Sequence, residues 1–434
     1  MTYEEVVNRL TKTEFFSAFA GLYRMHAMLR YFDNPQDAVP CVHVAGTNGK
    51  GSVCSMLASV LQQAGYRVGL FTSPYLLNIR ERICVDGEMI PEDDMARIGT
   101  TVYDYVGKSF APANQFELLT VIALLYFREV KCDIMILETG LGGTFDPTNC
   151  VTSPVASVIT NIGLDHCAVL GDTIEKIAAA KAGIIKNGCD VCVYPVTMEA
   201  ERVITEFALR ASAPIHMVDK DAVKQLPDVT GMEHFSYKGT EVLLPLRGKH
   251  QQYNAATALE AIRIINENGF YVSDADIANG LRTVRWPARL EIICKKPLVY
   301  LDGGHNPQCL AAVSEFFASK EFSGKRLTVI CGMVKDKDVR SMLTILRKMT
   351  DRLYFYRFEN RRALTAEETG ALCEEFSMTP VTDMTEECRD LFAKATGEDV
   401  FLITGSLYLV PEALSAVHAY EEHRRLSDAN GGAQ

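Results

Sequence analysis

The sequence predicts an α/β protein with two domains, a larger N-terminal domain built on a parallel sheet and a smaller C-terminal domain. Two observations predict this fold. Short apolar runs of β type alternate with helical patterns along most of the chain, which is typical of parallel sheets covered by helices on both faces. The chain also has 434 residues, which exceeds the usual size of a single hydrophobic core.

The N-terminal series contains apolar runs that we expect to be buried strands: Val39–Val44, Val68–Phe71, Asp133–Leu137, Val155–Thr160 and Asp190–Tyr194. A helix is expected between the first two, because apolar residues recur there at the spacing of one helix face. These residues are Val53, Met56, Leu57, Val60 and Leu61, and Gly65 marks the end of the helix.

A second βα series predicts the smaller, Rossmann-like domain. Its expected strands are Leu298–Leu301, Leu327–Cys331, Leu353–Phe358 and Val400–Thr404. Trp286 and Pro287 precede this series, and the proline breaks any helix there. We therefore expect domains at residues 1–296 and 297–434, with a β-rich excursion at Pro227–Gly248 closing the first domain.

Charge and cysteine content narrow the classes of function. The formal net charge of −11 argues against general nucleic-acid binding, which needs a basic surface. The 13 cysteines are odd in number and scattered, and Cys189 and Cys192 would point to opposite faces of a strand, so a reducing cytoplasm is expected. The start MTYEEVVNRL has no apolar signal core, and the longest apolar run, Val121–Phe127, is far shorter than the ~20 residues that span a bilayer.

A glycine-rich loop is the strongest local signal of function. The run HVAGTNGKGS, His43–Ser52, follows an expected strand and opens the expected helix. In that setting backbone N–H groups can surround a phosphate and Lys50 can neutralise it, so the N-terminal domain is expected to be P-loop ATPase-like. The loop is a variant, because Val44 stands where a standard P-loop has glycine and Ser52 lies one position late. A glycine-rich turn with a solvated lysine is the alternative.

Polar residues at the ends of two further strands are candidates for metal and base chemistry. Glu138 ends the strand beside the loop and precedes Gly140, Gly142 and Gly143, which is where such domains hold Mg²⁺. His166 follows the next strand, and is a ligand candidate or a structural histidine. Lys181 lies in an alanine-rich helix and would by itself be read as a solvated lysine.

The second domain carries one candidate motif of its own. Asp302 and His305 lie in LDGGHNP, Leu301–Pro307, where a strand ends and a helix begins. Both side chains are expected to face the cleft between domains. A common Asp-Gly strand-end turn is the alternative reading.

An ordered set of motifs resembles the folylpolyglutamate synthase/dihydrofolate synthase family of the Mur-ligase superfamily. The resemblance covers nearly the whole chain and rests on these runs in order: HVAGTNGKGS, FTSPYLLNIRERI, ILETGLGGTFDPTN, ITNIGLDHCAVLGDTIEKIAAAKAGIIK, GKHQQYNAATAL, WPARLE, LDGGHNP, GMVKDKD and TGSLYLV.

The resemblance implies a role for each matching residue. It implies an ATP phosphate loop at Asn48, Gly49, Lys50, Gly51 and Ser52, and magnesium ligands at Ser73, Glu138 and His166. It implies further ATP contacts at Asn254, Arg289 and Asp302. Lys181 matches a lysine that is carbamylated in this family, and His305 lines the same cleft, so the implied catalytic residues are Lys50, Lys181, His166 and His305. It implies that the pterin or folate substrate is contacted by Phe116, Glu117, Thr120 and Tyr75.

The activity implied is an ATP- and Mg²⁺-dependent ligase that adds L-glutamate to a reduced folate or to dihydropteroate through an acyl phosphate. We expect a cytoplasmic monomer with small-molecule substrates and no nucleic-acid or membrane partner. Tyr75 and Thr144 depart from the histidine and arginine usual in the family, which leaves the choice of acid open. The alternatives are a Mur-type ligase for another amino acid and acid, a nucleotide switch, and an inactive structural protein.

Overall fold

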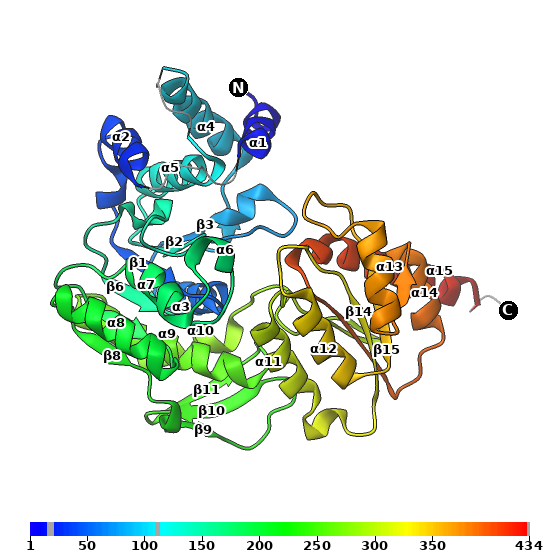
Figure 1. Cartoon of the computed structure of the whole chain (residues 1–434). Helices are drawn as coiled ribbons and strands as arrows, with labels where there is room; N and C mark the ends of the chain where they lie inside the picture. Colours follow the sequence, from blue (N-terminus) through cyan, green and yellow to red (C-terminus); the bar gives the residue numbers. More distant parts are fainter. Residues whose placement is uncertain (15–20, 109–112, 432–434) are drawn as a thin grey trace. The chain divides into compact units, whose positions relative to one another are not determined.

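The computed structural model describes residues 1–14, 21–108 and 113–431 and divides into two compact units (Figure 1). The first unit comprises Met1–Pro245 and Gln251–Arg285, and the second comprises Leu246–His250 and Trp286–Gln434. Each unit has its own sheet, so the two-domain α/β prediction is confirmed.

The first unit is built on an eight-stranded sheet of order β4-β3-β2-β5-β1-β6-β7-β8. Strands β2 to β8 in this order run parallel, and β3 and β4 are antiparallel additions at one edge. The strands are β1 Cys41–Ala45, β2 Val68–Phe71, β3 Ile83–Val85, β4 Glu88–Met89, β5 Ile134–Glu138, β6 Ala156–Ile159, β7 Val191–Val193 and β8 Ile215–Met217. The five strands expected here are β1, β2, β5, β6 and β7.

Helices cover both faces of this sheet (Figure 1). Their bounds are α1 Tyr3–Lys12, α2 Tyr23–Tyr31, α3 Lys50–Gln63, α4 Glu92–Val106, α5 Gln115–Glu129, α6 Cys167–Leu170, α7 Ile174–Ala182, α8 Met198–Arg210, α9 Lys249–Glu267 and α10 Asp274–Thr283. One core joins α1, α2, α4 and α5 to residues such as Phe71 and Leu137 of the sheet. A second core joins α7 and α8 to β6 and β7.

A separate antiparallel sheet of three strands completes the first unit. Its strands are β9 Val223–Gln225, β10 Glu233–Tyr237 and β11 Thr240–Leu244. The β-rich excursion expected at Pro227–Gly248 therefore begins earlier, at Val223. Tyr237 anchors the sheet to α9, since its hydroxyl donates to Glu260 at 2.6 Å.

The second unit has a six-stranded sheet of order β12-β13-β17-β14-β15-β16, in which only β12 is antiparallel to its neighbour. The strands are β12 Glu291–Lys295, β13 Leu298–Leu301, β14 Arg326–Cys331, β15 Arg352–Tyr356, β16 Thr379–Val381 and β17 Asp399–Thr404. The helices are α11 Pro307–Phe317, α12 Val339–Met349, α13 Ala366–Glu375, α14 Met384–Ala393 and α15 Val410–Gly431. Short 3-10 segments lie at Pro35–Asp37, Ile79–Arg82, Pro147–Cys150, Lys220–Ala222, Lys320–Phe322 and Leu407–Leu409.

The division between the units differs from the boundary expected at residue 296. The second unit begins at Trp286, because β12 pairs with β13 and so belongs to the sheet of the second unit. Leu246–His250 also belong to this unit, although they precede the last helices of the first. The pairing of β12 with β13 across a short turn was not apparent from the sequence, because apolar and polar residues do not alternate strictly in β12.

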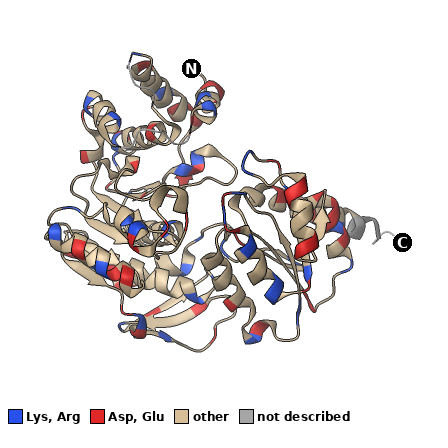
Figure 2. Ribbon diagram, in the orientation of Figure 1, with Lys and Arg blue, Asp and Glu red and all other residues tan. Residues whose placement is uncertain are grey.

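Surface charge is mixed on the exposed helices. In Figure 2 acidic and basic residues share α8, where Glu199, Glu201 and Glu206 lie on the same helix as Arg202 and Arg210. Among the described residues, no helix is both long enough and apolar enough to cross a membrane.

Candidate active site

The phosphate loop connects β1 to α3. Neighbouring atoms leave no room for a side chain at its Gly46 and Gly49. A Cβ on Gly46 would lie 1.8 Å from Thr160 Oγ1, and a Cβ on Gly49 would lie 2.5 Å from Asn254 Oδ1. Gly49 has a φ of 86°, in the left-handed region that favours glycine, and it contributes no side chain to cap α3. The first N–H groups of α3 are therefore available to an anion, with the helix dipole favouring negative charge.

Hydrogen bonds from β6 and the loop that follows it hold the phosphate loop in place. Thr160 Oγ1 donates to Asn48 O at 2.8 Å, and Thr47 exchanges bonds with Gly163 at 3.0 and 3.1 Å. The Asn48 amide lies 3.5 Å from the Asn161 side-chain oxygen. The sequence-predicted loop is thus pre-formed by contacts more than 100 residues away in the chain.

Lys50 and Lys181 meet at one carbonyl oxygen. Lys50 Nζ donates to Gly46 O at 3.1 Å and to Thr47 O at 3.2 Å, and Lys181 Nζ donates to Gly46 O at 2.7 Å. Lys181 is 4% exposed, so it is not the solvated lysine that its helix alone suggests. Burial, reinforced by the charge of Lys50, moves the pKa of Lys181 well below its ordinary value. Burial therefore favours the neutral form of the Lys181 amine, which lies within hydrogen-bond distance of Gly46 O.

Glu138 lies at the carboxyl end of β5, next to β1 in the sheet, and is 3% exposed. Its carboxylate accepts the Ser73 backbone N–H at 2.9 Å, which brings two of the predicted magnesium ligands together. His166 directly precedes α6 and has a φ of 51°, and its side chain is 37% exposed. It lies on the loop after β6, one strand beyond β1.

This donor set suits Mg²⁺ held together with nucleotide phosphates. The described residues contain no group of three or more His, Cys, Asp or Glu side chains arranged for a metal ion. Mg²⁺ in phosphoryl-transfer sites commonly takes only one or two protein carboxylates, with phosphates and water completing its shell. Glu138 is one such carboxylate, and it accepts the backbone N–H of Ser73, the second predicted ligand.

One predicted nucleotide residue, Asn254, reaches the loop from α9 of the first unit. Asn254 is 3% exposed on α9 and donates its side-chain N–H to Gln251 Oε1 at 3.0 Å. Gln251 in turn donates to Ser52 Oγ at 3.3 Å. Ser52 is therefore bonded to α9, and the Asn254 side chain lies close against Gly49 of the loop.

A buried carboxylate missed by the sequence reasoning organises the glycine loop after Glu138. Asp146 accepts the backbone N–H groups of Gly140 and Leu141, each at 2.9 Å, and the Thr148 hydroxyl at 2.6 Å. That hydroxyl also lies 2.8 Å from His43 Nε2, and burial lowers the pKa of His43 to about 3. The Asp-Pro pair at 146–147, typical of a turn, was the available signal.

Thr144, which replaces the arginine usual in the family, ties the same loop to α7. Its backbone N–H and its hydroxyl both donate to Ala180 O, at 2.9 and 3.0 Å. Ala180 directly precedes Lys181, so this contact fixes the spacing between the glycine loop and the buried lysine.

The residues expected on the pterin side lie largely in the core. Glu117 is 2% exposed and pairs with Arg24 at 2.9 Å, a partner that the sequence did not reveal. Thr120 donates its hydroxyl to Phe116 O within its own helix, and Phe116 packs beneath Gly140. Tyr75 is half-buried and its ring, like that of Phe116, flanks the Arg82 guanidinium, at 5.3 and 5.9 Å.

In the second unit, Arg289, Asp302 and His305 form a compact group. Asp302 accepts the Leu290 and Gly304 N–H groups at 3.0 and 2.8 Å, and burial raises its pKa despite the nearby Arg289. Arg289 bonds Ala288 O at 2.8 Å, and His305 Nδ1 lies 3.0 Å from Gly303 O.

The backbone around Arg289 is strained. Ala288 and Leu290, its two neighbours, have φ values of 55° and 47°. Left-handed backbone at non-glycine residues costs about 1–3 kcal/mol each and concentrates at functional sites. The structure thus holds Arg289 in a specified orientation within the second unit.

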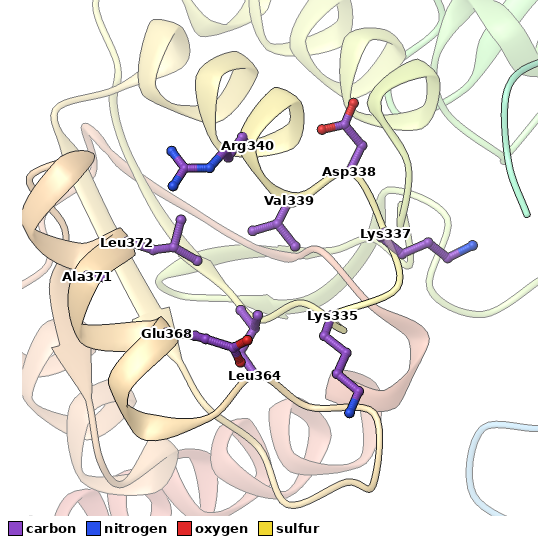
Figure 3. Close-up of a pocket in the computed structure, with 9 residues that line it drawn as sticks. All are labelled: Lys335, Lys337, Asp338, Val339, Arg340, Leu364, Glu368, Ala371 and Leu372. Atoms are coloured by element: carbon purple, nitrogen blue, oxygen red, sulfur yellow. The ribbon is translucent and has the colours of Figure 1, made fainter. Parts of the chain in front are cut away.

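A pocket of about 400 Å³ lies elsewhere in the second unit, at the start of α12 (Figure 3). Figure 3 shows an apolar floor of Val339, Leu364 and Leu372, from which the ends of Lys335 and Lys337 point away. The remaining lining residues are Asp338, Arg340, Glu368 and Ala371. None of the predicted site residues lines it.

Comparison with known proteins agrees with this arrangement. Residues 44–262 match the Mur ligase middle domain, and residues 288–407 match the Mur ligase glutamate ligase domain. The dihydrofolate synthase/folylpolyglutamate synthase of Bacillus subtilis is 36% identical over 409 residues, covering 92% of this chain and 95% of that protein. The enzyme of the same name from Escherichia coli is 34% identical, covering 87% and 86%.

Solved structures show the same fold. Mycobacterium tuberculosis folylpolyglutamate synthase complexed with ADP superposes with a TM-score of 0.86 at 27% identity, covering 96% of this chain and 98% of that one. A complex of folylpolyglutamate synthase (FPGS) with AMPPCP and folate superposes with a TM-score of 0.81 at 29% identity, covering 97% of this chain and 99% of that one. The chain therefore belongs to the folylpolyglutamate synthase/dihydrofolate synthase family, within the Mur ligases.

Proposed function

We propose that this protein uses ATP and Mg²⁺ to join L-glutamate to the carboxylate of a reduced folate or of dihydropteroate. The observation that carries the proposal is the meeting of Lys50 and Lys181 at Gly46 O, beside the uncapped start of α3. Positive charge, backbone N–H groups and a buried carboxylate at Glu138 are the groups that a nucleotide triphosphate with its metal requires.

The chemistry follows from the poor reactivity of a carboxylate toward an amine. The acceptor carboxylate oxygen forms a bond to the γ-phosphorus while the bond between the β- and γ-phosphates breaks, which gives an acyl phosphate. The glutamate nitrogen then forms the amide bond as phosphate leaves and the nitrogen loses its proton. The protein contributes position and charge stabilisation, with Lys50 as the mobile cation that neutralises the transferring group.

We assign Ser73, Glu138 and His166 to hold Mg²⁺, which would neutralise charge on the transferring phosphoryl group. The bond from Ser73 N–H to Glu138 supports this assignment, since it fixes the carboxylate at the strand end. Glu138→Gln should reduce turnover by at least 10²-fold by comparison with loss of one electrostatic stabiliser. Unchanged dependence of turnover on Mg²⁺ concentration in this variant would contradict the assignment.

We further propose that Lys181 is carbamylated. The reaction needs a neutral amine, and burial beside Lys50 favours one, because it moves the pKa of Lys181 well below its ordinary value. Carbon dioxide would form a bond to Nζ, which would lose a proton, and the resulting anion would lie beside Lys50 and could help to hold Mg²⁺. Intact-protein mass measurement in bicarbonate, with Lys181→Met as the control, should show one added carbon dioxide on the wild-type protein alone.

The second unit is proposed to complete the nucleotide contacts through Arg289 and Asp302, with His305 near the reacting groups. The strained backbone at Ala288 and Leu290 supports a functional role for Arg289. We also propose that the protein acts as a cytoplasmic monomer without nucleic-acid or membrane partners. All 13 cysteines are free, which suits a reducing compartment, and light scattering of the purified protein tests the monomer.

The direct test is a mass-spectrometric assay with ATP, Mg²⁺ and glutamate, in which dihydropteroate and tetrahydrofolate are offered separately. A glutamyl product from dihydropteroate identifies a dihydrofolate synthase, one from tetrahydrofolate a polyglutamate synthase, and both a bifunctional enzyme. Lys50→Ala should lower turnover by roughly 10²–10³-fold. If neither acid gains glutamate while ATP hydrolysis still depends on Lys50, the protein is a Mur-type ligase for a different acid.

A further inference from the structure

An exposed phenylalanine projects from the glycine loop that follows Glu138. Phe145 is 64% exposed, although large aromatic side chains usually gain free energy from burial. It lies at the carboxyl edge of the first sheet, where α/β proteins bind their ligands. Nothing in the phosphate, metal or lysine chemistry described above uses this ring.

The backbone on both sides of Phe145 is fixed. Thr144 is bonded twice to Ala180 O of α7, at 2.9 and 3.0 Å. Asp146 is buried and accepts the N–H groups of Gly140 and Leu141 and the hydroxyl of Thr148. With both neighbours anchored, the Phe145 ring is presented to solvent by a rigid loop, and a ligand that contacts it would lose little affinity to loop ordering.

Other exposed apolar side chains follow nearby strands of the same sheet. Leu77 follows β2, and Leu164 and Val169 follow β6; they are 63%, 53% and 69% exposed. The α6 segment that carries Val169 contacts the glycine loop, because a Cβ on Gly142 would lie 3.0 Å from Leu170 Cδ2. Strands β2, β5, β1 and β6 are neighbours in the sheet, so apolar side chains recur along one edge of it.

We infer that Phe145 contacts the aromatic part of the acid substrate and contributes to the enzyme's selectivity for it. The inference rests on the proposed function, which makes the acceptor an aromatic acid with its carboxylate near Glu138 and Lys50. An aromatic ring presented on a rigid support is suited to stack with, or pack edge-on against, another ring. Glutamate and ATP phosphates offer no such surface, so the contact distinguishes the acceptor from the other two substrates.

The test compares Phe145→Ala, Phe145→Tyr and the control Leu209→Ala, which truncates a side chain that is 74% exposed on α8. Dissociation constants for tetrahydrofolate, dihydropteroate and ATP are measured by titration, with glutamate omitted. Phe145→Ala should weaken binding of the acceptor that the wild-type enzyme uses by roughly tenfold, the scale of one lost aromatic contact, and leave ATP binding within about twofold. Phe145→Tyr should restore acceptor affinity, and Leu209→Ala should change nothing.

The outcomes separate this inference from the proposed function. If the wild-type protein joins glutamate to neither acid, the proposed function fails. If it does so and Phe145→Ala binds the acceptor as tightly as wild type, the inference alone is wrong. An equal loss of acceptor and ATP affinity in Phe145→Ala would also overturn it, because that result reports a displaced loop rather than a specific contact.

Discussion

Two glycines at opposite ends of α3 provide a matched test of the phosphate loop. Gly49 and Gly65 have the same φ, 86°, but different surroundings. A Cβ on Gly49 would lie 2.5 Å from Asn254 Oδ1, whereas a Cβ on Gly65 would have no heavy atom within 4 Å. Gly49→Ala and Gly65→Ala therefore share one backbone penalty, and only the first adds a collision.

The expected magnitudes follow from these surroundings. An alanine in the left-handed region costs about 1–2 kcal/mol, which applies to both variants. The clash in Gly49→Ala must also move Asn254, which is buried and bonded to Gln251 at 3.0 Å. Loss of a buried hydrogen bond costs about 1–3 kcal/mol more. Gly49→Ala should thus destabilise the protein by roughly 2–5 kcal/mol and Gly65→Ala by roughly 1–2 kcal/mol.

The assay pairs unfolding with nucleotide binding. Urea unfolding of the two variants gives the free-energy difference, and ATP titration gives the functional effect. We expect ATP affinity to fall at least tenfold in Gly49→Ala and to stay within twofold of wild type in Gly65→Ala. Equal ATP affinity in the two variants would refute the placement of Gly49 and Asn254 at the nucleotide.

Three further sets of substitutions test charged or titratable groups, at Lys181, at His250 and at the Arg24–Glu117 pair. Lys181→Met should raise the thermal midpoint, because a buried amine is replaced by an apolar chain of similar length, and should abolish turnover. A lowered midpoint would contradict an energetic cost of burying this amine. Burial next to Arg289 lowers the pKa of His250 to about 4. Between pH 6.5 and pH 4, His250 is therefore protonated in the unfolded chain but not in the folded protein. Stability should fall by about 3 kcal/mol as the pH drops from 6.5 to 4, and His250→Gln should flatten pH-dependent urea unfolding over that window. Glu117→Ala leaves Arg24 buried without its carboxylate and should cost about 3–5 kcal/mol, whereas Arg24→Met combined with Glu117→Leu should recover most of the loss in the same unfolding assay.

Local pattern was sufficient to predict the central strands of the two larger sheets, but not β3, β4, β8, β12 and β16 toward their edges. Strands such as β1 and β5 are buried at every position, so they read as continuous apolar runs. Helix α3 is marked by its apolar spacing and by glycine at both ends. Antiparallel β12 was harder to predict, because only Cys294 in it is buried and its pairing shifts register between Ile292 and Cys294.

Contacts between distant residues were beyond reach of the sequence pattern. Glu117 and Arg24 are 93 positions apart, and nothing local distinguishes a glutamate paired in the core from one that contacts substrate. The same holds for Lys181. Its alanine-rich helix suggests an exposed side chain, but in the structure its amine donates to Gly46 O. Burial of these charges depends on tertiary packing, which motif spacing does not encode.

The central claim is that the protein activates the acceptor carboxylate by phosphorylation before glutamate attacks. The most direct measurement labels that carboxylate with ¹⁸O and follows the label by mass spectrometry in the presence of ATP, Mg²⁺ and glutamate. The account predicts a glutamyl product and one ¹⁸O atom in each phosphate released. Amide formation with unlabelled phosphate, or ATP hydrolysis without any glutamyl product, would contradict it.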